Sequence, residues 1–137
     1  MGTLSRNKQQ EVAMNIIYQA LLYLDMDEEL DLEQLISNNL GIPFKEVDIY
    51  IKQVCVSAIL HKDEAIAVFS ANMDTWKFSR LSLLMRAILL LSYAHFYYIK
   101  DVDKEVVINV AVVLSKKYLN ETDYKFVNAI LEKTLNV

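Results

Sequence analysis

The sequence predicts an all-α fold, and three observations support this prediction. The chain has 137 residues, 54% of them hydrophobic, which fits one domain that buries a core without a metal or disulfide. Its two glycines and single proline are too few turn residues for a sandwich or barrel of many short strands. Apolar residues also recur in several segments at the three- and four-residue spacing of one helical face.

The first predicted helix spans about 7–24, and an acidic segment follows it. Its apolar face contains Ala13, Ile17, Ala20, Leu21 and Leu24. Six acidic residues fall within Asp25–Glu33. We interpret them as a solvated loop and the charged first turn of the next helix, with an acidic partner-binding patch as the alternative. Asp31 is the predicted N-cap of a short helix that ends at 39–41, where Gly41 is a typical C-terminal signal.

A longer helix is predicted from Pro43 to about Phe69, because proline suits the first turn of a helix. The predicted buried face consists of Val47, Ile51, Val54, Ala58 and Ile59. Cys55 and Met73 are predicted packing groups.

The C-terminal part is predicted to begin near Asp74 with a short turn or helix around Trp76, followed by an apolar helix over about 79–98. A charged turn at 100–103 leads into a helix over 104–118. Residues 106–113 are rich in β-branched side chains and alone would favour a strand. We predict a helix because the apolar residues Val107, Val110, Ala111, Leu114 and Tyr118 share one helical face. In addition, no second strand is available to pair with this segment. Thr122 is the predicted cap of a last helix that ends near 135.

Neither a secretion signal nor a membrane span is expected. Residues 1–10 are polar and lack the apolar core of a signal peptide. The longest charge-free apolar stretch, 87–99, is shorter than the roughly 20 residues that a bilayer span requires. Arg86 and Lys100 bracket it. We therefore expect a buried central helix in a soluble, cytoplasmic protein.

Few side chains in the sequence support catalysis. Cys55 is the only cysteine, which excludes an internal disulfide and a multi-thiolate zinc site. Two glycines cannot build a phosphate-binding glycine loop. We interpret His61 as part of a solvent-facing polar segment and His95 as a core side chain with satisfied hydrogen bonds. We expect no enzyme activity, no metal and no cofactor.

Two clusters combine cations with aromatic rings, as a nucleic-acid surface requires. Because the net charge is −4, such a surface must be local. The first cluster contains Arg6, Lys8 and Tyr18, and the second contains Lys116, Lys117, Lys125, Phe126 and Asn128. The alternative interpretation is that the lysines complement a helix dipole and that Phe126 belongs to the core.

Residues 101–133 resemble the C-terminal signature of the NusB family. The matching elements are Ile-Asn-x-Ala at 108–111, Leu-x-Lys-Lys-Tyr at 114–118 and Lys-Phe-Val-Asn at 125–128. Upstream, Trp76 and Arg-Ala-Ile-Leu at 86–89 resemble the start of the family's central helix, and Ile-Tyr-Gln at 17–19 is similar to its Leu-Tyr-Gln. The agreement is ungapped from about 86 to 133, moderate over 6–24 and limited to general character over 25–72.

The resemblance implies a NusB-like helical bundle of about seven helices. It implies one domain, 1–137, built from two packed subdomains over about 1–72 and 73–137. It also implies a transcription antitermination factor without enzyme activity that binds boxA-type nascent RNA together with a small ribosomal subunit protein, NusE, in the transcription elongation complex. A homodimer is an open alternative state. The RNA-binding residues that the resemblance implies are Arg6, Lys8, Tyr18, Lys125, Phe126 and Asn128, although the role of Asn128 can also be structural.

Departures from the family pattern keep a second functional class open. Asn7, Gln9 and Gln10 stand where more basic residues are usual, and fewer phosphate contacts mean lower affinity and a shallower salt dependence. Val110 replaces the acid of Ile-Asn-Glu-Ala. The second class is a NusB-like protein–protein interaction module with weak or no RNA binding. A related variant is the accessory RNA-binding domain that NusB-like modules supply to ribosomal RNA methyltransferases.

Two further departures concern partner contacts more than the fold. Asp103 stands where the family commonly has a proline, and His95 stands where a glutamate often follows a tyrosine.

Overall fold

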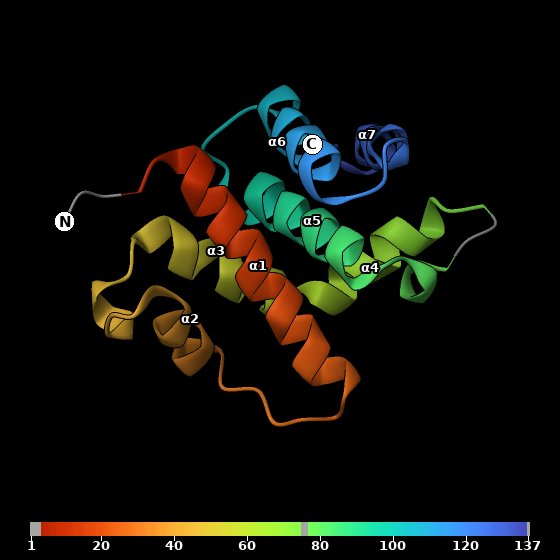
Figure 1. The fold of residues 1–137 in the computed structure, drawn as a ribbon. Helices are drawn as coiled ribbons and strands as arrows, with labels where there is room; N and C mark the ends of the chain where they lie inside the picture. Colours follow the sequence, from red (N-terminus) through yellow and green to blue (C-terminus); the bar gives the residue numbers. More distant parts are fainter. Residues whose placement is uncertain (1–3, 75–76, 137) are drawn as a thin grey trace.

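The chain forms a bundle of helices in the computed structural model, which describes residues 4–74 and 77–136 (Figure 1). Within these ranges there are seven α-helices and no strand. They are α1 (Arg6–Asp25), α2 (Leu32–Leu40), α3 (Ile49–Leu60), α4 (Lys62–Ala71), α5 (Leu83–Ala94), α6 (Lys104–Tyr118) and α7 (Asp123–Thr134). The predicted all-α bundle of about seven helices is confirmed.

Helix α5 is the centre of the bundle. It packs against α1, α3 and α6, and Figure 1 shows α1 lying beside it, in front of α3. Every residue from Ala87 to Ala94 is buried, so this helix is apolar on all sides. The predicted buried central helix is confirmed, and none of the helices in the two described ranges is long and apolar enough to span a bilayer.

The first two helices begin and end close to the predicted positions. The Ser5 hydroxyl caps α1 by accepting a hydrogen bond from the backbone N–H of Lys8. The apolar face of α1 is buried, apart from Leu24 at its end, which is half-buried. Asp31 caps α2 through the N–H of Gln34, and Gly41 ends α2 with a φ of 68°, a left-handed conformation that glycine adopts without strain.

The single helix predicted from Pro43 to Phe69 is wrong, because the chain turns twice in this range. Residues 44–46 form a 3₁₀ turn, and Asp48 then caps α3 by accepting a hydrogen bond from the N–H of Tyr50. A second break at His61 separates α3 from α4. The predicted packing groups are still placed correctly: Val47, Ile51, Val54, Cys55 and Ala58 are buried, and Ile59 and Met73 are half-buried.

The break at His61 contacts Tyr93 of α5 and Tyr98 of the turn that follows α5. The His61 ring stacks on Tyr98 with a centroid distance of 3.8 Å. Glu64 accepts hydrogen bonds from the hydroxyls of Tyr93 and Tyr98, both at 2.7 Å. The predicted solvent-facing segment at His61 is therefore wrong in part, since His61 is half-buried and Glu64 is engaged by two tyrosines.

The apolar helix predicted over 79–98 differs at both ends. Residues 78–80 form a 3₁₀ turn, and α5 begins after Ser82, whose hydroxyl accepts a hydrogen bond from the N–H of Met85. At the other end, residues 95–99 form one π-helical turn. Lys100 closes it with a φ of 58°. Trp76 lies outside the described residues.

Helix α6 confirms the helical prediction for the β-branched segment. Val107, Ala111 and Leu114 are buried in one face, so tertiary burial outweighs the local preference for a strand. Tyr118 does not belong to this core face, since it is 41% exposed. Helix α7 follows Thr122 as predicted, but the Thr122 side chain makes no capping bond there; instead the Asp123 carboxylate accepts the N–H of Asn120 at 3.1 Å.

Candidate nucleic-acid interface

The start of α1 meets the end of α6 at one carboxylate, that of Glu11. The Lys117 Nζ lies 2.6 Å from Glu11 Oε1, and the Tyr118 hydroxyl donates a hydrogen bond to the same oxygen. The Lys8 Nζ lies 4.0 Å from Glu11 Oε2. Two ammonium groups and a phenol from two distant parts of the chain therefore converge on one anion.

These contacts fix the charges of the groups around Glu11. The hydrogen bond from Lys117, followed by that from Tyr118, lowers the pKa of the Glu11 carboxyl. The hydrogen bond to Glu11 raises the pKa of Lys117 and also that of Tyr118. The Glu11 side chain is 17% exposed and that of Lys117 is 57% exposed. The carboxylate is thus largely covered, while the ammonium group remains open to solvent.

The break between α6 and α7 carries the second group of cations. The Lys116 Nζ lies 4.6 Å from the centroid of the Tyr124 ring, a cation–π contact. Lys125 is exposed at the start of α7, and Asn128, three residues later, is exposed on the same face. Both lie away from the buried face of α7, which contains Val127, Ile130, Leu131 and Thr134.

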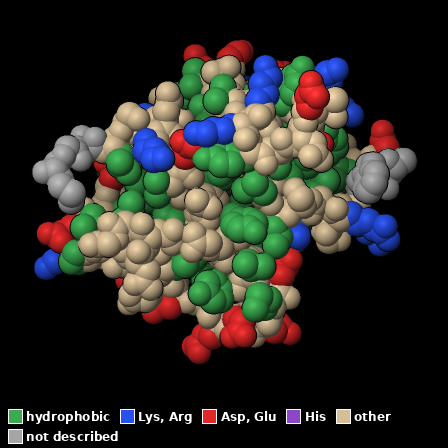
Figure 2. Space-filling model, viewed as in Figure 1, with side chains coloured by type: hydrophobic (Ala, Val, Ile, Leu, Met, Phe, Trp, Pro, Cys, Tyr) green, Lys and Arg blue, Asp and Glu red, His purple; other side chains and the backbone are tan. Residues whose placement is uncertain are grey.

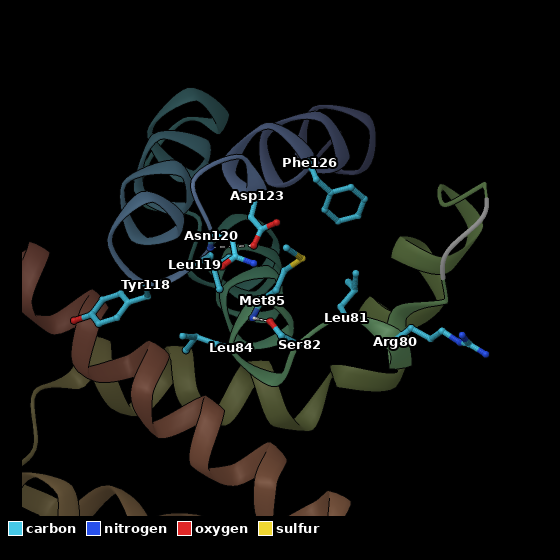
Figure 3. A pocket seen from close by; sticks show the side chains of 10 residues that line it. All are labelled: Arg80, Leu81, Ser82, Leu84, Met85, Tyr118, Leu119, Asn120, Asp123 and Phe126. Atoms are coloured by element: carbon cyan, nitrogen blue, oxygen red, sulfur yellow. Dashed lines mark hydrogen bonds between the residues drawn. The ribbon is translucent and has the colours of Figure 1, made fainter.

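A groove of about 600 Å³ lies between the α6–α7 break and the start of α5. Its lining residues are Arg80, Leu81, Ser82, Leu84, Met85, Tyr118, Leu119, Asn120, Asp123 and Phe126. Figure 3 shows Tyr118 at the end near α1 and Phe126 at the opposite end, with Met85 between them. Phe126 is half-buried. Aromatic rings at the two ends of an apolar groove suit the stacking of unpaired bases.

Tyr18 lies on the same side of α1 as Glu11, two helical turns further along, because seven residues separate them. It is half-buried and packs against the core. Lys8, Glu11 and Tyr18 thus follow one another along one side of α1, and of the three only Lys8 is exposed.

Arg6 belongs to a different group of contacts. Its guanidinium lies 2.8 Å from Asp101 Oδ2 and 4.1 Å from the centroid of the Tyr50 ring. Partial burial raises the pKa of Asp101, but the hydrogen bonds from Arg6 and His95 outweigh this effect and lower it. The structure therefore brings Lys8 together with Lys117 but places Arg6 in a separate ion pair.

His95 completes that group and is buried, with 2% of its surface exposed. Its Nε2 lies 2.7 Å from Asp101 Oδ1, and its Nδ1 lies 3.3 Å from the Tyr50 hydroxyl. The prediction of a core histidine with satisfied hydrogen bonds is confirmed. In the part of the chain that the structure describes, no three histidine, cysteine or acidic side chains form a group that would hold a metal ion.

Charge is unevenly distributed over the face that contains α1. Figure 2 shows most lysine and arginine side chains of this face in its upper half, over the start of α1, α6 and α7. A group of acidic side chains occupies the lower end, where the loop between α1 and α2 lies. Acidic side chains also lie among the cations of the upper half, so the two kinds of charge alternate there, whereas the lower end is mainly acidic.

Sequence reasoning missed three contributors to this surface: Glu11, Tyr118 and Tyr124. The helical spacing places Tyr118 only on the apolar face of its helix. The available signal was the Lys-Lys-Tyr run at 116–118, which places an aromatic ring beside two cations at the end of a helix.

Comparison with known proteins gives consistent results for sequence and structure. The sequence profile of the NusB family matches residues 7–136. The transcription antitermination protein NusB of Clostridium botulinum (strain Loch Maree / Type A3) is 30% identical over 141 aligned residues, which cover 96% of this chain and 100% of the relative. The protein of the same name from Listeria innocua serovar 6a is 32% identical and covers 82% of this chain and 85% of its own length.

Two solved structures share the fold. A structure of T. maritima NusB superposes with a TM-score of 0.82 at 24% identity, covering 98% of this chain and 92% of that chain. A structure of the antitermination factors NusB and NusE in complex with double-stranded RNA superposes with a TM-score of 0.78 at 22% identity, covering 95% of each chain.

Proposed function

The chain belongs to the NusB family, and from that premise we propose that it is an RNA-binding transcription antitermination factor. In this proposal it recognises boxA-type nascent RNA together with a small ribosomal subunit protein, NusE, as part of the transcription elongation complex in the cytoplasm. It acts by binding and has no enzyme activity of its own. A related structure that contains NusB, NusE and double-stranded RNA supports the choice of partners.

The observation that carries the proposal is the meeting of α1 with the α6–α7 break. Lys8 and Lys117 both lie near Glu11, and the α6–α7 break that follows carries Lys116, which lies over the Tyr124 ring, and the exposed Lys125. Lysine side chains neutralise phosphates, while Tyr18, Tyr118 and Phe126 offer rings to unstacked bases. Of the residues that the resemblance implies, Lys8, Tyr18, Lys125 and Phe126 fit this surface. Asn128 extends it along α7, and Arg6 would reach RNA only after leaving Asp101.

The proposed surface needs both halves of the chain. We propose one domain made of two helical subdomains, about 1–72 and 73–137. Lys8 and Tyr18 come from the first, and Lys125 and Phe126 come from the second. RNA that contacts both would span the seam at which α1 lies against α5 and α6.

A second function, a protein–protein interaction module with weak or no RNA binding, has an observation of its own. Two cations near the proposed surface are already paired with carboxylates, Arg6 with Asp101 and Lys117 with Glu11. Each pairing reduces the charge that is available to a phosphate.

Binding of RNA by the purified chain decides between the two functions. The chain is titrated, with and without NusE, into a boxA-type RNA and into a scrambled RNA of the same composition. The antitermination proposal predicts tighter binding to the boxA-type RNA, increased further by NusE. Equal affinity for the two RNAs in both conditions would contradict it and leave the interaction module. Light scattering of the same samples distinguishes a monomer from a homodimer.

A further inference from the structure

We propose that Glu11 fills an anion-binding site formed by Lys8, Lys117 and Tyr118, and that an RNA phosphate must compete with it for this site. The inference rests on the proposed RNA binding for its biological meaning. The anion site itself can be tested without RNA.

The geometry around Glu11 is that of a bound anion. Lys117 Nζ lies 2.6 Å from one carboxylate oxygen, which also accepts a hydrogen bond from Tyr118, and Lys8 Nζ lies 4.0 Å from the other oxygen. Phosphate oxygens accept hydrogen bonds from the same donors, because both anions offer several lone pairs to charged N–H groups. Among the ion pairs of the described residues, Glu11 is the only carboxylate that two lysines approach.

Exposure gives the direction from which a ligand would arrive. The side chains of Lys8 and Lys117 are 59% and 57% exposed, whereas that of Glu11 is 17% exposed. The lysines therefore reach into solvent beyond the carboxylate that they hold. A phosphate that approaches from solvent therefore contacts lysines whose charge the Glu11 carboxylate already partly neutralises.

This arrangement lowers the contribution of Lys117 to RNA binding. A cation that is already paired releases little of the counterion atmosphere of RNA, and the carboxylate repels a nearby phosphate. Loss of the Glu11 charge should therefore tighten binding about threefold to tenfold. It should also steepen the dependence of log K on log salt by about 0.7, the value for one additional contact with single-stranded RNA.

The variant Glu11→Gln tests this directly, since glutamine keeps an acceptor oxygen for Lys117 and Tyr118 but carries no charge. Glu132→Gln is the matched control, because it removes the same charge from a carboxylate 3.5 Å from Lys104, outside the Glu11 cluster. Each protein is titrated with boxA-type single-stranded RNA and, separately, with inorganic tripolyphosphate at several salt concentrations. We expect Glu11→Gln to bind both anions about threefold to tenfold more tightly than the wild type, and Glu132→Gln to remain within about twofold of it.

A double-mutant cycle separates competition from a merely structural role. Lys117→Gln should weaken tripolyphosphate binding by less than about twofold in the wild type but by about threefold to tenfold in the Glu11→Gln background. If Glu11 only ties α1 to α6, the loss of Lys117 has the same effect in both backgrounds. Thermal unfolding of each variant verifies that the proteins compared are folded.

The outcomes distinguish this inference from the proposed function. If Glu11→Gln binds RNA and tripolyphosphate no more tightly than Glu132→Gln, the inference is overturned, whatever the wild type does with RNA. If the wild type does not bind RNA but Glu11→Gln gains affinity for tripolyphosphate, the anion site stands and the proposed function is wrong.

Discussion

Asp101→Asn is expected to destabilise the protein while leaving its RNA affinity intact or increased. Asp101 accepts hydrogen bonds from Arg6 at 2.8 Å and from His95 at 2.7 Å, and so ties the start of α1 to the turn between α5 and α6. Asparagine keeps one acceptor oxygen but loses the negative charge. The substitution also removes the charge that pairs with Arg6, which in the proposed function reaches RNA only after leaving Asp101.

The magnitude follows from these two contacts and their exposure. Hydrogen bonds to charged groups contribute about 1.5–3 kcal/mol each. The Asp101 side chain is 38% exposed and that of Arg6 is 47% exposed, so solvent screens much of this contribution. Since asparagine also retains one hydrogen bond, we expect a loss of about 1–2 kcal/mol, or roughly 3–8 °C in Tm for a domain of this length.

The pH dependence has a definite sign. The folded-state pKa of Asp101 lies below its unfolded value, because the hydrogen bonds from Arg6 and His95 outweigh the opposing effect of burial. The stabilisation is therefore complete above the unfolded pKa of about 3.9 and is lost as the pH falls through the folded pKa. The difference in Tm between the wild type and Asp101→Asn should be largest near neutral pH and should shrink below about pH 4.

Thermal unfolding followed by circular dichroism at pH 7 and pH 3 measures both effects. Asp63→Asn is the control, because Asp63 pairs with the adjacent Lys62 at 3.0 Å but is 90% exposed. We expect its Tm to stay within about 1 °C of the wild type. An Asp101→Asn variant that unfolds like Asp63→Asn at pH 7 would refute the reasoning. A Tm difference that persists unchanged at pH 3 would refute it as well.

Four further substitutions and one thiol reaction test other parts of the molecule. Lys125→Ala should weaken boxA-type RNA binding and reduce its salt slope by about 0.7 without changing Tm. Phe126→Ala should weaken RNA binding and also lower the free energy of unfolding by about 1–2 kcal/mol, because its ring is half-buried. RNA titrations measure the affinity of each variant, and thermal unfolding measures its stability. Gly41→Ala should cost about 1 kcal/mol in chemical denaturation and Gly41→Asn less, because the φ of 68° and not a lack of space disfavours alanine there. Burial raises the pKa of the Cys55 thiol, so a thiol reagent should label the native protein far more slowly than the unfolded one.

Sequence signals predict a helix boundary reliably where residues within the helix itself determine that boundary. The capping residues Ser82 and Asp48 illustrate the limit, because each begins a helix at a position where hydrophobic periodicity alone predicted a continuous one. The break at His61 could not be predicted, since the Tyr98 ring that stacks on it comes from a different helix. Helix α6 was predicted correctly despite its β-branched residues because no partner strand existed.

The candidate site shows the same division between local and long-range information. Composition identified the cations at the start of α1 and at the α6–α7 break. It did not show that Lys117 and Glu11, 106 residues apart, would meet. Arg6 illustrates the same limit: a basic residue at a helix start suggests a phosphate contact, and the sequence does not show that the fold places Asp101 beside it.

The number of lysines without a carboxylate partner limits how tightly this chain can bind RNA in the absence of a protein partner. On the proposed surface, Lys116 and Lys125 form no ion pair with any described residue, and Lys8 lies at the outer limit of one. Three contacts with single-stranded RNA correspond to a salt slope of only about −2, which is typical of weak binding. A partner that brings its own cations to the RNA would steepen the slope, and this is the physical reason for including NusE in the proposed function. Salt titrations of boxA-type RNA with the chain alone and with the chain plus NusE measure the difference, and equal slopes would show that the partner adds no phosphate contacts.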